Sequence, residues 1–219
     1  MNIITVGDNV VDCYLDKGVY FPGGNCVNVA VNSKRSGANK VGYIGVFATD
    51  EKAKHIKYAL QSEGVDYELS RTVEGISGQP KVSLSEDGDR IFIGGPKNTV
   101  QHKMKLKMIQ DDYEYMSEFD VCHISCYSSL EEELSGISKH INISFDFSDN
   151  VDPAYLQKVC PHISIGFFSG AELSDFEIDD LVKLLSQYDM DIIGITRVIN
   201  LRCSLLMASG TSKMSWTYW

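Results

Sequence analysis

Short apolar runs alternate with amphipathic helical patterns along most of this chain, and this alternation constrains its fold more than any other feature. Apolar runs predict strands at 2–6 and 40–48, and helical patterns follow at 25–36 and 50–63. Asp50 is the expected N-cap of the second helix. Strands that alternate with helices of this length predict an α/β fold, with a mostly parallel sheet covered by helices on both faces.

The same alternation resumes in the second half of the chain. The expected strands are at 120–127, 141–147, 162–168 and 190–196, and the expected helices are at 130–140, 152–160 and 174–188. The segment "KVSLSEDGDRIFI" (81–93) differs, because two alternating runs are joined through Asp87-Gly88, a turn dipeptide. We interpret it as a hairpin that leaves the main sheet.

Composition excludes some classes of partner. Of the 219 residues 43% are apolar and 23% are charged, and the net charge is −10, which argues against nucleic-acid and anionic-membrane partners. The six cysteines form no Cys-x-x-Cys pair, and Cys122 and Cys126 are expected to be core side chains rather than metal ligands. No apolar run approaches 18 residues and no signal peptide precedes the first strand, so we expect a cytoplasmic protein with reduced thiols.

Polar side chains gather where the first strand ends, in "GDNVVDCY" (7–14). Asp8, Asn9 and Asp12 follow that strand directly. Ligands bind at the carboxyl ends of strands in a parallel sheet, and carboxylates accept hydrogen bonds from sugar hydroxyls. A polar loop with Asp8 as a turn former is the alternative.

The segment "FPGGNCVNVAVNSKRSG" (21–37) strengthens the ligand interpretation. Gly23 and Gly24 stand before a helix, where a backbone without side chains can approach a ligand closely. Asn25 is the expected N-cap, and Asn28 lies one turn further on. A carboxylate cluster so near this helix start predicts a pocket for a polyol or a sugar.

These segments carry a family resemblance. "GDNVVD", "PGGNCVNVAV", "VGYIGVFATDEKAKHIKYALQSEGVD", the hairpin, "FDVCHIS" and "FDFSD" resemble the ribokinase-like (PfkB-type) carbohydrate kinases, in order from residue 3 to about 196. Within that family they are most similar to the fructosamine kinases, which include kinases of fructoselysine. The resemblance implies a three-layer α/β/α domain over 1–219, with a small β lid near 13–21 and 80–95 that could also form a homodimer.

The resemblance also assigns roles to residues. Asp12 and Asn28 would hydrogen-bond sugar hydroxyls, and Gly23 and Gly24 would form a backbone wall. Arg90 on the hairpin would contact the anionic or amino-acid end of a substrate, with a solvated edge-strand charge as the alternative.

Two further carboxylates are candidates for the cofactor region that the resemblance implies, which would bind ATP and Mg²⁺. Glu172 fits the family's N-x-x-E pattern, although Ser169 replaces its Asn. Asp146 ends another strand and could line the same cleft. A helix-terminus carboxylate and a loop cap are the respective alternatives. His123 lies in an apolar strand and is expected to be a core histidine.

The last residues depart from the family pattern. The sequence contains no Gly-Ala-Gly-Asp motif, whose Asp is the family's general base, so no catalytic base is assigned. "SKMSWTYW" shows no phosphate-binding pattern, and a frameshift or premature stop would explain a tail at 198–219, with a genuinely divergent tail as the alternative. Without further helices one face of the sheet would stay uncovered, which predicts poor solubility or pairing with a second chain.

Four classes of function follow. A kinase that transfers phosphate from ATP to a fructosamine, at the 6-position of fructoselysine for example, is favoured. A non-catalytic sugar-binding protein and a nucleoside kinase of the same superfamily remain alternatives. A Rossmann oxidoreductase is disfavoured because the first βα turn lacks G-x-G-x-x-G.

Overall fold

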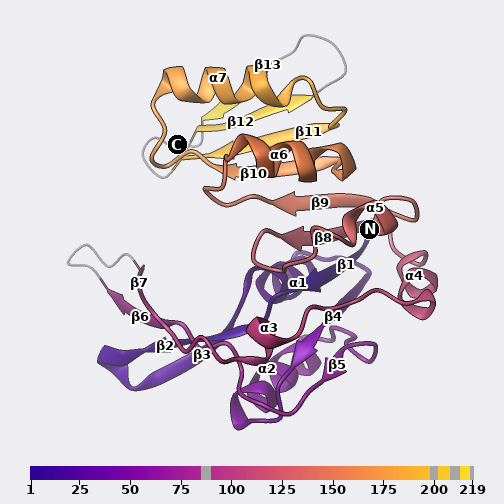
Figure 1. The fold of residues 1–219 in the computed structure, drawn as a ribbon, viewed down its shortest axis with the longest axis vertical. Coiled ribbons are helices and arrows are strands. Elements are labelled where there is room, and N and C mark those ends of the chain that lie inside the picture. Colours follow the sequence, from indigo (N-terminus) through magenta and orange to yellow (C-terminus); the bar gives the residue numbers. More distant parts are fainter. Residues whose placement is uncertain (85–89, 198–201, 208–212, 218–219) are drawn as a thin grey trace. The chain divides into compact units, whose positions relative to one another are not determined.

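The computed structural model describes residues 1–84, 90–197, 202–207 and 213–217, and for Arg90 and the last two segments it describes the backbone alone. The chain divides into two compact units. Unit 1 comprises residues 1–120 and 127–129, and unit 2 comprises 121–126 together with 130–219. Figure 1 shows the course of the chain through the elements of each unit.

Unit 1 has a parallel sheet built from apolar strands. Its order is β1 (Asn2–Gly7), β4 (Lys40–Phe47) and β5 (Arg71–Thr72), and β1 and β4 run in parallel register. Helix α1 (Asn25–Arg35) packs on β1 and β4, and α2 (Glu51–Ser62) follows β4. Apolar residues of β1 and β4 are buried against these helices. The strands and helices predicted for this half of the chain are confirmed.

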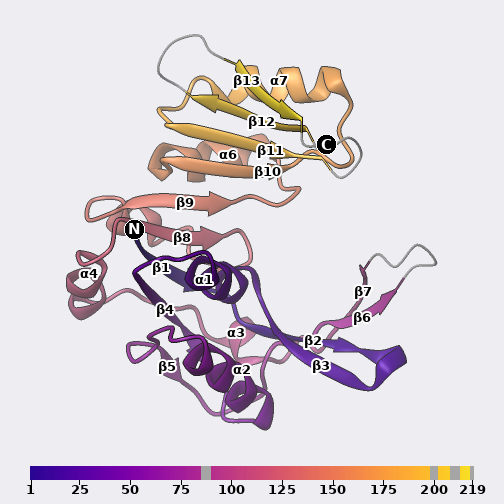
Figure 2. The same cartoon turned by 180° about the vertical axis from the view of Figure 1, so that it is seen from behind.

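A second, smaller sheet in unit 1 has four strands in the order β3-β2-β6-β7 (Figure 2). Their bounds are β2 (Val10–Tyr14), β3 (Val19–Gly23), β6 (Lys81–Leu84) and β7 (Arg90–Gly94), and the short 3-10 helix η1 (Leu15–Lys17) joins β2 to β3. The pairs β2–β3 and β6–β7 are antiparallel, as expected of hairpins. The predicted turn at Asp87-Gly88 lies outside the described residues.

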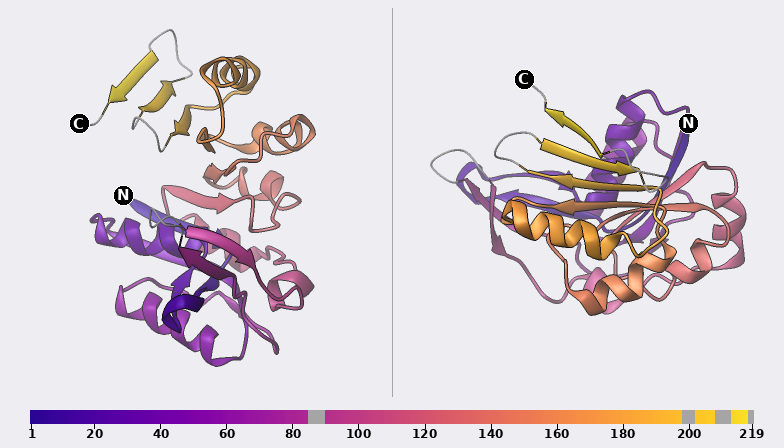
Figure 3. Two further views of the ribbon diagram at one scale, coloured as in Figure 1. Left: turned by 90° about the vertical axis from the view of Figure 1, so that its left-hand side faces the viewer. Right: turned by 90° about the horizontal axis from the view of Figure 1, so that it is seen from above.

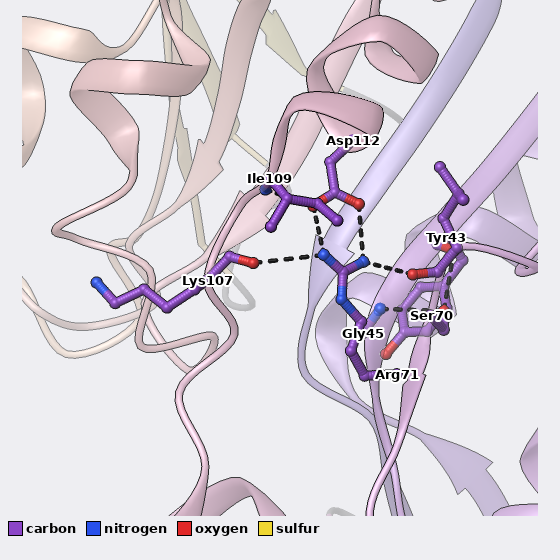
Figure 4. A network of polar contacts seen from close by, with 8 residues as sticks. Tyr43, Gly45, Ser70, Arg71, Lys107, Ile109 and Asp112 are labelled. Atoms are coloured by element: carbon purple, nitrogen blue, oxygen red, sulfur yellow. Dashed lines mark hydrogen bonds and ion pairs between the residues drawn. The ribbon is translucent and has the colours of Figure 1, made fainter.

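Two short helices of unit 1 escaped the sequence patterns, α3 (Val100–Lys103) and α4 (Gln110–Met116). Helix α4 is stabilised by tertiary contacts more than by the helix propensity of its residues. In Figure 4 the guanidinium of Arg71 donates two hydrogen bonds to the buried carboxylate of Asp112, one of them 2.7 Å long. The Asp112 carboxylate also accepts from the N–H of Ile109 at the start of α4, and Arg71 reaches the carbonyl oxygen of Lys107.

Unit 2 contains a six-stranded sheet in the order β8 to β13. Its four parallel strands are β8 (Val121–Ser125), β9 (Asn142–Asp146), β10 (Ile165–Ser169) and β11 (Ile192–Thr196). Two antiparallel strands follow, β12 (Arg202–Met207) and β13 (Lys213–Thr217). Helices α6 (Pro153–Val159) and α7 (Asp175–Leu185) lie on one face of this sheet (Figure 3).

Three phenylalanine rings pack together within the largely aliphatic core of unit 2. The rings of Phe147 and Phe168 stack with their centroids 4.3 Å apart, and Phe145 packs tilted against Phe147 at 4.7 Å. The predicted helix at 130–140 is reduced to α5 (Leu134–Ile137), and the 3-10 helix η2 (Cys160–His162) follows α6. Short α5 contains Ser135 and Gly136, both of low helix propensity.

The structure shows the surroundings of three side chains that the sequence placed in the core. His123 is buried, and its Nδ1 lies 3.0 Å from the hydroxyl oxygen of Ser144, as expected of a core histidine. Cys122 is buried as expected, whereas Cys126 is only partly buried, because β8 ends at Ser125 and Cys126 lies just beyond it. The described residues contain no cluster of ligands for a metal ion. No helix in the described ranges has the length and apolar character of a membrane span.

Asp50 ties the start of α2 to the segment before β6. Its carboxylate accepts from the N–H of Ala53 at 2.9 Å, and from the N–H and hydroxyl of Ser77 at 2.8 and 2.6 Å. Burial works to raise the pKa of this carboxyl, but the hydrogen bonds from Ser77 and Ala53 outweigh it and hold the pKa below its usual value. The folded state therefore favours the ionised form.

Asp50→Ala should lower stability at pH 7 by about 1 kcal/mol, because the helix loses its N-cap. Since the pKa is lower in the folded chain, the stabilisation is complete above the carboxyl's ordinary pKa of 3.8 and is lost as the pH falls through the folded value. The difference between the variant and the parent should therefore shrink on going from pH 7 to pH 3 in urea unfolding followed by circular dichroism. Asp50→Asn keeps a capping oxygen and should cost less at pH 7; an equal loss in both variants would contradict a capping role.

Candidate functional site

The Gly-Gly pair before α1 makes room for two carboxylates, one directly after β1 and one in β2. A Cβ atom added to Gly23 would lie 2.9 Å from Oδ2 of Asp12, and one added to Gly24 would lie 3.0 Å from Oδ2 of Asp8. Gly24 has a φ of +99°, a backbone conformation that favours glycine. The paired glycines thus bring Asp8 and Asp12 against the chain that enters α1.

Asp8 holds the start of α1. Its Oδ2 accepts from the N–H of Asn25 at 2.5 Å, and its Oδ1 lies 3.5 Å from the N–H of Cys26. The predicted N-cap Asn25 is the first residue of the helix itself, and Gly24 occupies the N-cap position without a side chain. Asp8, directly after β1, therefore supplies the oxygen that an N-cap residue usually supplies.

Asn9 is a structural residue in this geometry. It is buried, and its Nδ2 donates to the hydroxyl of Tyr43 at 2.8 Å and to the carbonyl oxygen of Val46 at 3.0 Å. The Tyr43 hydroxyl in turn donates to the carbonyl oxygen of Gly7. Asn9 thus locks the end of β1 to β4, and its amide nitrogen is committed to these two contacts.

Asp12 has the position that suits a ligand contact best. It lies in the middle of β2, directly opposite Phe21 of β3, on the small sheet. Asp12 is 8% exposed, and its side chain packs over the bare backbone of Gly23. A carboxylate held in this way is preorganised to accept hydrogen bonds from hydroxyl groups.

Sequence reasoning missed Ser128, which completes this region from far along the chain. Its hydroxyl donates to Oδ1 of Asp8 at 3.2 Å and lies 3.4 Å from Sγ of Cys26. Gly7, with a φ of +139°, leaves the space that this hydroxyl fills, since a Cβ there would meet it at 1.9 Å. The position of Ser128 directly after a predicted strand, at a carboxyl end, was the available signal.

The thiol of Cys26 beside Ser128 is expected to be unreactive. Burial, and then the neighbouring carboxylate of Asp8, raise the pKa of the Cys26 thiol well above its usual value. The thiol is therefore protonated near neutral pH, and a thiol in that form is a poor nucleophile.

A narrow cleft opens at the carboxyl ends of β1 and β4. Residues that line it come from both strands and from two later segments: Gly7, Asp8, Val46, Gln101, Met104, Leu106 and Tyr127–Ser129. Its cavity volume of 20 Å³ holds about one water molecule, so a sugar would have to lie over its open side. Tyr127 and Met104 are exposed at its rim.

Asn28 lies in different surroundings from Asp12. It is exposed on α1, where it lines a groove of 460 Å³ together with Asn25 and Asn32. Neither the carboxylate of Asp8 nor that of Asp12 lines this groove. The structure therefore does not bring Asn28 and Asp12 into one described cavity, and a shared role in sugar binding stays a prediction.

The candidate cofactor residues lie in unit 2 at the ends of neighbouring strands. Asp146 is the last residue of β9, and its Oδ1 accepts from the N–H of Ser148 at 2.7 Å. Glu172 is exposed in the loop after β10. Arg90 belongs to β7 of unit 1, but its side chain is outside the described residues.

Comparison with protein families decides the affiliation of the chain. A family model described as pfkB family carbohydrate kinase matches residues 3–186. The chain belongs to the PfkB family of carbohydrate kinases. The expected family is therefore confirmed.

Two PfkB relatives carry names that specify a substrate. The chain is 40% identical over 197 residues to fructosamine kinase FrlD of Bacillus subtilis, covering 90% of this chain and 69% of that protein. It is 32% identical over 171 residues to fructoselysine 6-kinase of Escherichia coli, covering 78% of this chain and 64% of that protein. The chain thus spans about two thirds of the length of these relatives.

Solved PfkB-like structures confirm the fold. The structure of Arabidopsis thaliana ribokinase complexed with ribose and ATP aligns with a TM-score of 0.80 at 16% identity. The alignment covers 99% of this chain and 77% of the ribokinase chain. A putative ribokinase II of Escherichia coli, in complex with ATP and Mg²⁺, matches 100% of this chain and 78% of its own, with a TM-score of 0.76 at 17% identity. The ribokinase-like α/β fold with its small β sheet is therefore shown.

Proposed function

We propose that the chain provides the sugar-binding part of an ATP-dependent fructosamine kinase. The observation that carries this proposal is Asp12, held over Gly23 in a small sheet, in a chain 40% identical to a fructosamine kinase. In this role the carboxylate of Asp12 accepts hydrogen bonds from sugar hydroxyls. Asp8 and Asn9 then act as positioning residues, because they hold α1 and β4 around it.

The proposed cofactors are ATP and Mg²⁺, which a structural neighbour binds. Magnesium keeps several waters and takes one or two protein carboxylates in addition to phosphate oxygens. Asp146 and Glu172, at the carboxyl ends of β9 and β10, fit such a sparse ligand set. The nucleotide supplies the phosphoryl group when bound, and these carboxylates would orient it. Because the 219 residues contain no Gly-Ala-Gly-Asp motif, no residue of this chain is assigned as the base.

Two further proposals concern assembly and location. The edge strand β7 exposes three consecutive apolar residues, Ile91, Phe92 and Ile93, each at least half exposed. An exposed apolar edge strand pairs readily with another chain, so we place a homodimer contact there. The cytoplasmic location expected from the sequence stays a prediction.

Calorimetric titration of the purified chain with fructoselysine, fructose, ribose and adenosine tests this function. Binding of fructoselysine in preference to the others supports it, and preference for adenosine would favour a nucleoside kinase. Mass analysis of each sugar after incubation with ATP and Mg²⁺ then separates transfer from binding alone. Sugar binding without phosphorylation would favour the non-catalytic alternative for this polypeptide.

Asp12→Asn should weaken fructoselysine binding about 10- to 100-fold, since a hydrogen bond to a charged group contributes about 1.5–3 kcal/mol. The neighbouring fold should be unaffected, because the amide is almost the same size as the carboxylate. Asp111→Asn, at an exposed position in α4, is the matched control and should bind as the parent does. Equal affinity in the parent and the Asp12 variant would remove Asp12 from the binding site.

A further inference from the structure

One face of strands β2 and β3 carries a carboxylate and two aromatic rings. Asp12 and Tyr14 are two residues apart on β2, so their side chains point to the same face. Phe21 stands directly opposite Asp12 in the antiparallel register, which places it on that face as well. We call these three residues, together with Lys17, the β2–β3 subsite.

The two rings of the subsite form a pair that remains open to solvent. The centroids of Tyr14 and Phe21 are 5.7 Å apart and the ring planes are nearly perpendicular, at 82°. Phe21 is 54% exposed, so the pair is not core packing. Aromatic faces of this kind attract C–H groups and cations such as ammonium.

Lys17 adds a positive charge beyond the rings. It ends the 3-10 helix η1, which Gly18 terminates in the left-handed conformation with a φ of +62°. The Nζ atom of Lys17 lies 5.8 Å from the centre of the Tyr14 ring. Among the described residues, Lys17 has no carboxylate within ion-pair distance, so its ammonium group remains available to an anion.

We propose that the β2–β3 subsite binds the amino-acid part of a sugar–amino-acid adduct, an inference that rests on the proposed function. The order of groups along the protein matches the order in such a ligand. Asp12 accepts from sugar hydroxyls, the rings of Tyr14 and Phe21 face the secondary ammonium, and Lys17 pairs with the terminal carboxylate. The strand advances about 7 Å from Asp12 to Tyr14, which is on the scale of one sugar ring.

This arrangement discriminates between substrates by charge. Fructose has hydroxyls for Asp12 but has neither an ammonium nor a carboxylate group for the rest of the subsite. A fructose joined to an alkylamine adds the ammonium group, and fructose joined to glycine adds both. Lys17 should therefore affect only the ligand that carries a carboxylate.

The opposite face of the same two strands provides a matched control. Tyr20 stands opposite Cys13, and the Nζ atom of Lys52 lies 5.8 Å from the centre of its ring, the same distance as in the subsite. Lys52 also donates to the side-chain oxygen of Gln79. A lysine–tyrosine pair of equal geometry, pointing away from Asp12, should contribute nothing to ligand selection.

The test is calorimetric titration of the 219-residue chain and its Lys17→Met and Lys52→Met variants with three ligands: fructose, fructosyl-propylamine and fructosyl-glycine. Lys17→Met should weaken fructosyl-glycine binding about fivefold at low salt, because the pair is exposed, and less at high salt. Binding of fructose and of fructosyl-propylamine should remain unchanged, and Lys52→Met should bind all three ligands as the parent does. Phe21→Ala should weaken binding of both fructosamines about tenfold.

The outcomes separate this inference from the function on which it rests. If the parent binds the fructosamines and Lys17→Met binds fructosyl-glycine equally well, the β2–β3 subsite is refuted and the proposed function stands. Equal losses in Lys17→Met and Lys52→Met would also refute it. If the parent binds none of the three ligands, both proposals fail.

Discussion

Gly24→Ala is expected to destabilise the chain by about 2–5 kcal/mol, because the new methyl group meets both backbone strain and a backbone clash. Gly24 has φ +99° and ψ 139°, a region that is almost exclusive to glycine. An added Cβ would lie 2.8 Å from the carbonyl oxygen of Asp8 and 2.9 Å from Cα of Asn9. Neither atom is the end of a flexible side chain, so β1 and α1 would have to separate.

Gly37→Ala is the matched control for this prediction. Gly37 also has a positive φ, +92°, but no atom lies within 4 Å of its added Cβ. Gly37→Ala should therefore lower stability only through the strain of the left-handed region, by about 1–2 kcal/mol. Both substitutions restrict the unfolded chain equally, so their difference in urea midpoint, followed by circular dichroism, isolates the clash. Equal midpoints would mean that the chain entering α1 yields without cost.

Arg71→Met is expected to lower stability by about 3 kcal/mol, because it leaves the carboxylate of Asp112 buried without its cation. The Asp112 side chain is 1% exposed and that of Arg71 28%. The remaining hydrogen bond from the N–H of Ile109 cannot replace two bonds from a guanidinium. The loss should be measured by urea unfolding at pH 7.

A double-mutant cycle distinguishes the loss of this pair from the loss of packing. Arg71→Met combined with Asp112→Leu removes the stranded charge, and so should be more stable than Arg71→Met alone. Arg35→Met breaks an exposed pair with Glu63 and should leave the midpoint nearly unchanged, because solvent screens that pair. A double variant less stable than both single variants would show that packing, rather than charge, carries the effect.

The sequence predicted the parallel sheets well and the connections poorly, for a physical reason. The long apolar runs of β1, β4, β9 and β11 are buried on the sheet and leave a clear pattern. Helix α4 leaves none, since its start depends on the carboxylate of Asp112 and on Arg71, which lies 41 residues earlier. Contacts of such long range cannot be recognised from local periodicity.

The candidate site was predicted in part. The sequence placed Asp8, Asn9 and Asp12 together at a strand end, and the structure gives them different surroundings. Asp8 caps a helix and Asn9 pins a strand, two tasks that a local pattern cannot distinguish from ligand binding. The role expected for Gly23 as a wall for the ligand also has a nearer explanation, because the space that it leaves is filled by Asp12.

The hydroxyl of Ser128, seated against Gly7 and bonded to Asp8 across 120 residues of sequence, has a consequence for the order of folding. Unit 1 lacks its last three residues until the chain has passed through β8, which belongs to unit 2. Closing so long a loop costs conformational entropy that only late contacts repay. During synthesis, the hydrogen bond between Asp8 and Ser128 therefore forms only after β8 has been made. A polypeptide ending at residue 120 should remain more open to proteases than unit 1 in the complete chain.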